Sequence, residues 1–148
     1  MENYSISRFK KKEKYILGCT PLLIHNGKKQ KLFKENMIPM KNGEINPPSI
    51  LGHGLENHAR TAVGIKDNKI YLIIVESVEN NSGCTLLDLQ EIGIKLKLES
   101  FLNLDGGGSS QFKFKTESGW ITNQVKEEDK NRTLGNVIVL FEEKLKIE

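Results

Sequence analysis

The residues whose types and spacing best suit chemistry form one run, residues 105–110, which reads Asp-Gly-Gly-Gly-Ser-Ser. Three consecutive glycines are costly to order and add no side-chain packing, so such a run suits a sharp turn or a close approach to the backbone. Successive glycine N–H groups can also form a concave nest for an anion, with Asp105, Ser109 and Ser110 on its rim. A hairpin turn between two strands explains the run equally well, and both interpretations stay open.

Arginine usage is the most informative feature of the composition. The chain has 19 lysines and only three arginines, Arg8, Arg60 and Arg132. Where lysine supplies nearly all the positive charge, an arginine indicates a need for planar, bidentate binding of a carboxylate or a phosphate. A structural ion pair, for example with Asp105 or Glu76, is the alternative for each arginine.

The glycine-rich run, together with the Asn-Leu that precedes it, resembles the signature of the phosphodiester glycosidase domain. The resemblance covers roughly residues 19–141, and the glycine signature is its most specific part. Several other segments fit the family pattern in the same order along the chain. These are residues 60–64 (Arg-Thr-Ala-Val-Gly), residues 82–86 (Ser-Gly-Cys-Thr-Leu), Asn123, Arg132 and residues 135–136 (Gly-Asn).

The resemblance implies a hydrolase of glycosidic phosphodiesters, as in the lysosomal family member that removes N-acetylglucosamine from a mannose-6-phosphate diester. It implies that Asp105 is the catalytic residue, which protonates the leaving oxygen or activates water. A purely structural role, in which the carboxylate accepts hydrogen bonds from the glycine loop, is an equally economical reading of Asp105.

The resemblance also implies a ligand-binding set of guanidinium, hydroxyl, amide and backbone groups. We expect the two family arginines to converge with the glycine loop on one concave site and to hold phosphate. Thr85 is explained at least as well as a helix N-cap. The full set is Arg60, Thr85, Gly106, Gly107, Gly108, Ser109, Ser110, Asn123 and Arg132.

The histidines and cysteines do not predict a metal or a cofactor. His25, His53 and His58 lack ligand spacing on any predicted element, although His58, two residues before Arg60, is the one expected to line the site. The two cysteines, Cys19 and Cys84, also lack ligand spacing, and we interpret them as free, buried thiols rather than as a bridge.

The hydrophobic pattern, turn signals and capping signals of the sequence predict an α+β fold, with a mixed, twisted sheet and one principal helix packed on it. Asn26-Gly27 is a hairpin turn signal. Thr85 and Asp88 have capping-box spacing at the start of a helix whose apolar face runs from Leu86 to Leu96. The segment 70–76 is apolar on both faces, which predicts a central strand joined by a crossover to a parallel neighbour. The expected strands are one or two in 15–24, then 60–65, 70–76, 101–105, 111–115 and 137–141, with a helix over 85–97 and a long loop over 35–58.

Length and composition predict a single globular domain. The chain has 148 residues, 37% apolar residues and a net charge of +3. We expect residues 1–14 to be a basic arm and residues 15–148 to be one domain, a compact and N-terminally shortened version of the family. No nucleic-acid motif, signal peptide or membrane span is evident. We therefore expect a cytoplasmic location, and we expect neither a nucleic-acid polymer nor a membrane as a partner. A homo-oligomer stays open.

Two functions follow as hypotheses. The first is a protein that binds a phosphorylated sugar or nucleotide of the sugar-phosphate diester type on the 105–110 loop and hydrolyses it. The second is a non-catalytic sequestering protein that holds the same class of ligand. The Lys-, Ile- and Asn-rich composition suits a low-GC bacterium or its phage, so this alternative includes a phage-encoded pocket for a host immune signal such as a cyclic nucleotide or an ADP-ribose derivative.

Overall fold

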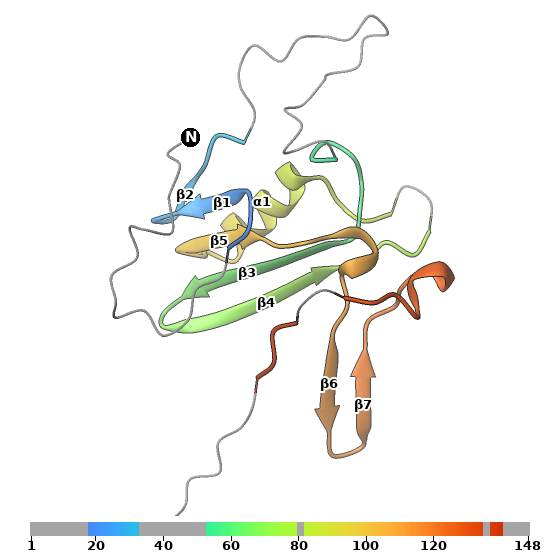
Figure 1. Ribbon diagram of the computed structural model, residues 1–148. Helices are drawn as coiled ribbons and strands as arrows, with labels where there is room; N and C mark the ends of the chain where they lie inside the picture. Colours follow the sequence, from blue (N-terminus) through green and yellow to red (C-terminus); the bar gives the residue numbers. More distant parts are fainter. Residues whose placement is uncertain (1–17, 33–52, 80–81, 135–136, 141–148) are drawn as a thin grey trace, which may run out of the picture.

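Two antiparallel β-sheets and one α-helix make up the described part of the chain, which in this computed structural model comprises residues 18–32, 53–79, 82–134 and 137–140 (Figure 1). Two short 3-10 helices, η3 and η4, flank the second sheet along the chain. The elements are β1 (Leu22–His25), β2 (Lys28–Lys29), β3 (Arg60–Lys66), β4 (Lys69–Val75), α1 (Leu86–Lys95), β5 (Ser100–Asn103), η3 (Gly107–Ser109), β6 (Lys113–Thr116), β7 (Gly119–Thr122) and η4 (Glu127–Asp129).

The main sheet has the strand order β2-β1-β5-β3-β4, and each of its described pairings is antiparallel. The α+β class with one principal helix is therefore confirmed. The predicted crossover between parallel neighbours is wrong, because β3 lies between β4 and β5 and pairs with both. The β4–α1–β5 connection thus joins two strands that point the same way without being neighbours.

Local turn and cap chemistry agrees with the predictions. Asn26 and Gly27 both have positive φ, 49° and 70°, as a tight hairpin turn between β1 and β2 requires. Thr85 caps α1: its hydroxyl accepts from the Asp88 N–H, and the Asp88 carboxylate accepts from the Thr85 N–H. This reciprocal pair satisfies two N–H groups of the first turn, which fixes where α1 begins.

The core lies between α1 and the β1–β5 part of the sheet. Gly93 allows the closest approach, because a Cβ at this position would meet the Phe101 ring and, at 2.7 Å, Ile24 Cδ1. Leu96 does not belong to the packed face: α1 ends at Lys95, and the Leu96 side chain is 41% exposed. The buried apolar residues are Leu23, Ile24, Ala62, Cys84, Leu86, Leu89, Leu98 and Phe101.

Strand β4 is an edge strand in the described sheet, not the predicted central one. Its apolar character on both faces is nevertheless real. Tyr71, Ile73 and Val75 pack against the core under α1, while Ile70 and Leu72 on the other face are 65% and 48% exposed. Since the described helix covers only one face, the second face of the sheet is lined by exposed apolar side chains.

The β6–β7 hairpin extends away from the main sheet, as Figure 1 shows in brown and orange. All four residues of β7 are exposed, and Trp120 stacks beneath the ammonium group of Lys113 at 4.6 Å from the ring centroid. The expected last strand is not observed: residues 137–140 have no strand pairing, and Phe141 lies outside the described residues. The predicted basic arm and the 35–52 part of the predicted loop also lie outside them.

Candidate functional site

The glycine loop follows β5 and leads into the separate hairpin. It is not a hairpin turn, because β5 pairs with β1 and β3 whereas β6 pairs with β7. It is also not an open nest for an anion. The N–H groups of Gly107, Ser109 and Ser110 donate to Ala59, Gly106 and Gly107 carbonyls at 2.8, 3.2 and 3.0 Å. The loop therefore satisfies much of its own backbone by folding into η3.

A separate steric reason favours glycine at each of these three positions. A Cβ on Gly106 would lie 2.9 Å from the Ala59 carbonyl oxygen, and one on Gly108 would collide with the Asp129 carboxylate. Gly107 has φ of 59°, a left-handed conformation that favours glycine. The run thus allows the loop to pass between the start of β3 on one side and η4 on the other.

Asp105 is exposed at the entrance to this loop. Its Oδ1 accepts a hydrogen bond of 3.0 Å from the Gly106 N–H. Asp105, Ser109, Thr61 and Asn123 line a wide, open hollow of about 3100 Å³ between the second face of the sheet, the hairpin and residues 137–140. The carboxylate is therefore accessible, as an acid or base catalyst must be.

Ser110 and Asn123 are buried and hold the loop to the hairpin. The Thr61 hydroxyl donates to Ser110 Oγ at 2.9 Å, and Asn123 Nδ2 donates to the Ser110 carbonyl at 2.8 Å. Asn123 Oδ1 accepts from the Phe112 N–H at 2.7 Å. These bonds give both residues a structural role.

Arg60 is buried, and its guanidinium donates to backbone carbonyls. Nε donates to Cys84 at 2.9 Å, and one terminal nitrogen donates to His53 at 2.7 Å and to Glu56 at 2.8 Å. Burial lowers the pKa of Arg60 from its ordinary value. Its contacts hold the 53–56 turn against the segment that precedes α1. Thr85 is likewise engaged, as the helix cap described above.

Arg132 has a different environment from Arg60. Its side chain is 54% exposed, and a 3.4 Å contact to Asp129 Oδ1 uses one of the five guanidinium donors. Asp129 in turn lies against Gly108, and Gln111 Nε2 joins the Gly108 and Asp129 carbonyls at 3.0 and 3.3 Å. Arg132 therefore lies beside the glycine loop, and within the described part of the chain most of its guanidinium donors have no partner.

A cavity of about 230 Å³ brings part of the predicted set together. It contains Arg132, Gly107, Gly108 and Ser110, and His58, which was expected to line the site, lines it too. The predicted convergence of both arginines on one concave site is wrong for Arg60, which does not line this cavity and lies behind the loop, with its Cδ 3.9 Å from a Cβ built on Gly106. The remaining lining residues are Ala59, Ser77, Gln124, Val125, Lys126, Glu128 and Asp129.

The small cavity and the open hollow adjoin each other, because both are lined by Gln124, Val125, Lys126 and Glu128. Asp105 and Ser109 lie on the hollow, while Arg132 lies in the cavity. A ligand with two moieties could occupy both. Lys126 and Asp129 were missed from the sequence, since only the folding of η4 against the glycine loop brings them here.

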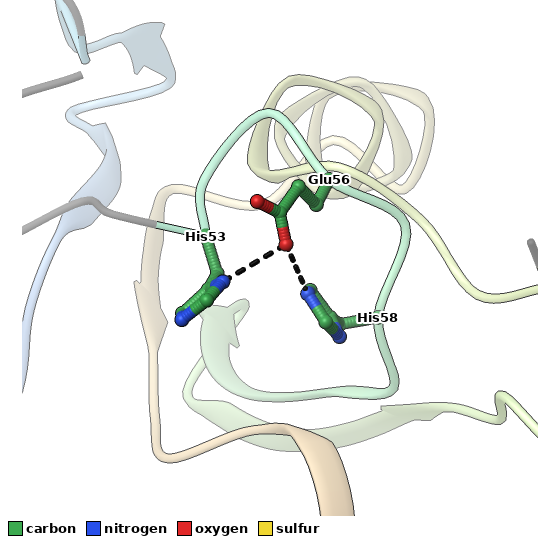
Figure 2. Close-up of side chains that lie close together, drawn as sticks. All are labelled: His53, Glu56 and His58. Carbon is green, nitrogen blue, oxygen red and sulfur yellow. Dashed lines mark hydrogen bonds and ion pairs between the residues drawn. The ribbon is translucent and has the colours of Figure 1, made fainter. Parts of the chain in front are cut away.

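The turn before β3 contains a cluster that was not expected. His53 Nδ1 and His58 Nε2 lie 2.9 and 2.8 Å from the same oxygen, Oε2 of Glu56, as Figure 2 shows. Hydrogen bonds from His53 and from His58 lower the pKa of Glu56 below its ordinary value. The spacing His-x-x-Glu-x-His within six residues was the available signal.

The two cysteines are free and have different environments. Cys19 is exposed, contrary to the expectation of two buried thiols, whereas Cys84 is buried between Arg60 and α1. Burial raises the pKa of the Cys84 thiol to about 11. Cys84 is therefore a poor nucleophile at neutral pH.

Comparison with known proteins gives one family match. The model of the phosphodiester glycosidase family matches residues 2–141. No curated protein matches the chain. The chain is also similar to the crystal structure of a hypothetical protein from Synechocystis, with 26% sequence identity and a TM-score of 0.46. The match covers 64% of this chain and 16% of the Synechocystis chain. The matched part is thus a small portion of that longer protein, and the similarity is too weak to define the fold. Among the described residues, no helix is long and apolar enough to cross a membrane.

Proposed function

This chain belongs to the phosphodiester glycosidase family, and on that premise we propose that it binds a phosphorylated sugar or nucleotide against the 105–110 loop and hydrolyses its glycosidic phosphodiester. The observation that carries the proposal is the 230 Å³ cavity that Arg132, Gly107 and Gly108 line together. A cavity of this size accommodates a phosphate group and part of a sugar. The other moiety extends into the adjoining hollow, toward Asp105.

In the proposed reaction, water attacks the anomeric carbon and the bond between this carbon and the phosphate oxygen breaks. The sugar gains a hydroxyl group and the phosphate leaves as a monoester. Asp105 takes the proton of the attacking water or protonates the leaving oxygen. Arg132 and Lys126 offset the negative charge of the phosphate, and Arg132 does so with the planar donors that match phosphate oxygens.

Non-catalytic sequestration is the second candidate. The observation that favours it is the separation of Asp105, which lines the hollow, from Arg132, which lines the cavity. A protein that only holds its ligand needs the cavity and the hollow but no proton transfer. Sugar-phosphate diesters fit both candidates, whereas cyclic nucleotides and ADP-ribose have no bond between an anomeric carbon and a phosphate and therefore fit sequestration alone.

Asp105→Asn separates the two candidates. The amide keeps the shape of the side chain but cannot act as an acid or a base, so hydrolysis should fall by about 10²- to 10⁴-fold while binding persists. The measurement is incubation of wild type and variant with sugar-phosphate diesters, cyclic nucleotides and ADP-ribose, followed by chromatography of the ligand recovered after denaturation.

Each result of this assay has a defined meaning. Product formed by wild type and lost in Asp105→Asn supports hydrolysis and rejects sequestration. Bound but intact ligand recovered from wild type rejects hydrolysis of that compound. If wild type neither retains any of these compounds nor converts any of them to product, the binding proposal itself is contradicted. Glu79→Gln, which changes an exposed carboxylate that lines neither the hollow nor the cavity, is the matched control and should leave both readouts unchanged.

A further inference from the structure

The turn that precedes β3 presents three metal-ligating side chains to solvent. One ligand atom from each of His53, Glu56 and His58 lies within 4.8 Å of the other two. The imidazole rings are nearly perpendicular, at 84°, with centroids 5.3 Å apart, and the Glu56 carboxylate points between them (Figure 2). The three side chains thus converge on one point from a segment of six residues.

The backbone beneath these side chains is held by buried contacts. The Arg60 guanidinium donates to the carbonyls of His53 and Glu56. His58 exchanges two backbone hydrogen bonds with Cys84, at 3.0 and 3.3 Å, and the Gly54 carbonyl accepts from Leu86 at 2.8 Å. Both ends of the turn are therefore attached to the folded core, so the ligand atoms are arranged in advance rather than gathered at the expense of chain entropy.

We propose that His53 Nδ1, Glu56 Oε2 and His58 Nε2 bind a divalent transition-metal ion, with Zn²⁺ as the ion whose chemistry fits best. Two imidazoles and one carboxylate are a donor set that zinc accepts, and three protein ligands leave further positions for water or substrate. Metal–ligand bonds of about 2.0–2.1 Å in a tetrahedral site separate the ligand atoms by about 3.3 Å. The present separations of 2.8 and 2.9 Å from Oε2 are those of hydrogen bonds, so metal entry displaces the shared protons and moves these exposed side chains apart by a few tenths of an ångström.

The position of the cluster gives the metal a consequence for ligand binding. His58 also lines the 230 Å³ cavity with Gly107, Gly108 and Arg132. A cation held by His58 adds positive charge at the edge of that cavity, where it favours an anionic ligand. The metal site itself rests on the three side chains and does not depend on the proposed hydrolysis.

The test is direct titration of the full chain, stripped with a chelator, with ZnCl₂ by calorimetry and with CoCl₂ by visible absorption. We expect one ion per chain for wild type. The variants His53→Ala, His58→Ala and Glu56→Gln should each raise the dissociation constant by at least about tenfold, the lower limit of what loss of even an outer-shell partner costs. All titrations use a Cys19→Ser background with reductant, because Cys19 is an exposed thiol that could bind zinc.

His25→Ala is the matched control, since His25 is exposed at the end of β1 and lies outside the cluster. It should leave the affinity unchanged. The three cluster side chains are 39–76% exposed, so the variants should fold, which far-ultraviolet circular dichroism verifies. Binding that is absent in wild type at about 1 mM metal, or equal in all variants, would overturn the site and identify the cluster as a hydrogen-bonded triad only. Both readouts are independent of Arg132 and of hydrolysis.

Discussion

Arg60 and Arg132, the two arginines of the family pattern, have opposite structural environments. Arg60 is buried and donates to three carbonyls, whereas Arg132 is exposed in a cavity beside the glycine loop. The same substitution at both positions therefore separates fold support from ligand contact. Lysine keeps the charge but loses the planar set of donors.

Arg60→Lys should lower the free energy of unfolding by about 2–4 kcal/mol, because one ammonium group cannot reach both the Cys84 carbonyl and the carbonyls of the 53–56 turn and leaves buried acceptors unpaired. Chemical denaturation with two-state analysis measures the loss. Arg132→Lys is the control and should change stability by no more than about 0.5 kcal/mol, since its side chain is half exposed. Equal stability of the two variants would contradict the structural role of Arg60.

Arg132→Lys should instead weaken ligand binding, by about 1–3 kcal/mol, because the paired donors to a phosphate are lost. Calorimetry with a compound that wild type retains, for example ADP-ribose, measures the change. Lys69→Ala, which removes an exposed charge at the start of β4 and outside both the hollow and the cavity, should have a much smaller effect. A dissociation constant that is unchanged in Arg132→Lys counts against a phosphate contact at this residue.

At the scale of elements, the packing of α1 on the sheet depends on Gly93. Gly93→Ala improves helix propensity by about 1 kcal/mol, but the added Cβ meets the fully buried Phe101 ring, and overpacking costs about 1–3 kcal/mol. The overpacking cost equals or exceeds the gain in propensity, so we expect a net loss of stability of up to about 2 kcal/mol in thermal or chemical unfolding.

Two further variants test whether the loss comes from contact between the added Cβ and Phe101. Lys95→Ala, on the exposed side of the last turn, should change stability little. Phe101→Leu combined with Gly93→Ala should be less destabilising than the sum of the two single changes, because the smaller side chain makes room for the Cβ. A more stable Gly93→Ala protein would show that α1 does not press on β5.

Much of the local structure could be predicted because neighbouring residues determine it. The Asn26-Gly27 turn and the Thr85–Asp88 capping box depend on side chains within four positions of each other. The pairing of β5 with β3 could not be predicted, because periodicity tells which faces of a strand are apolar but not which strand lies beside it. For the same reason β4 was expected at the centre of the sheet.

Only part of the candidate site could be predicted, because some of its contacts depend on how distant segments pack. Gly107, Gly108 and Arg132 share a cavity, in agreement with their joint place in the family pattern, and their role in binding stays a prediction. The contacts of Arg60 could not be predicted, because they depend on the path of the 53–56 turn across the segment at Cys84. Only the folded chain brings those carbonyls to one guanidinium.

For the whole molecule, the described elements are unevenly distributed about the main sheet. α1 and the buried apolar residues lie on one face, while the other face adjoins the open hollow and the β6–β7 hairpin (Figure 1). The glycine loop is the point at which these parts meet, because it leaves β5 and is hydrogen-bonded to the segment after β7 through Asn123. The candidate site thus lies where the sheet and the hairpin join.

The burial of Cys84 makes its thiol a probe of local opening, which chemical modification can measure. With its pKa raised to about 11, only about one Cys84 thiol in a thousand is ionised at pH 8, and the thiol is covered as well. A pulse of iodoacetamide should therefore modify exposed Cys19 quickly, and Cys84 only when the junction of the 53–58 turn with α1 opens. Mass spectrometry of the two adducts measures both rates in one sample, and Arg60→Lys should speed the second far more than the first. Comparable rates at the two thiols in wild type would show that this junction opens readily.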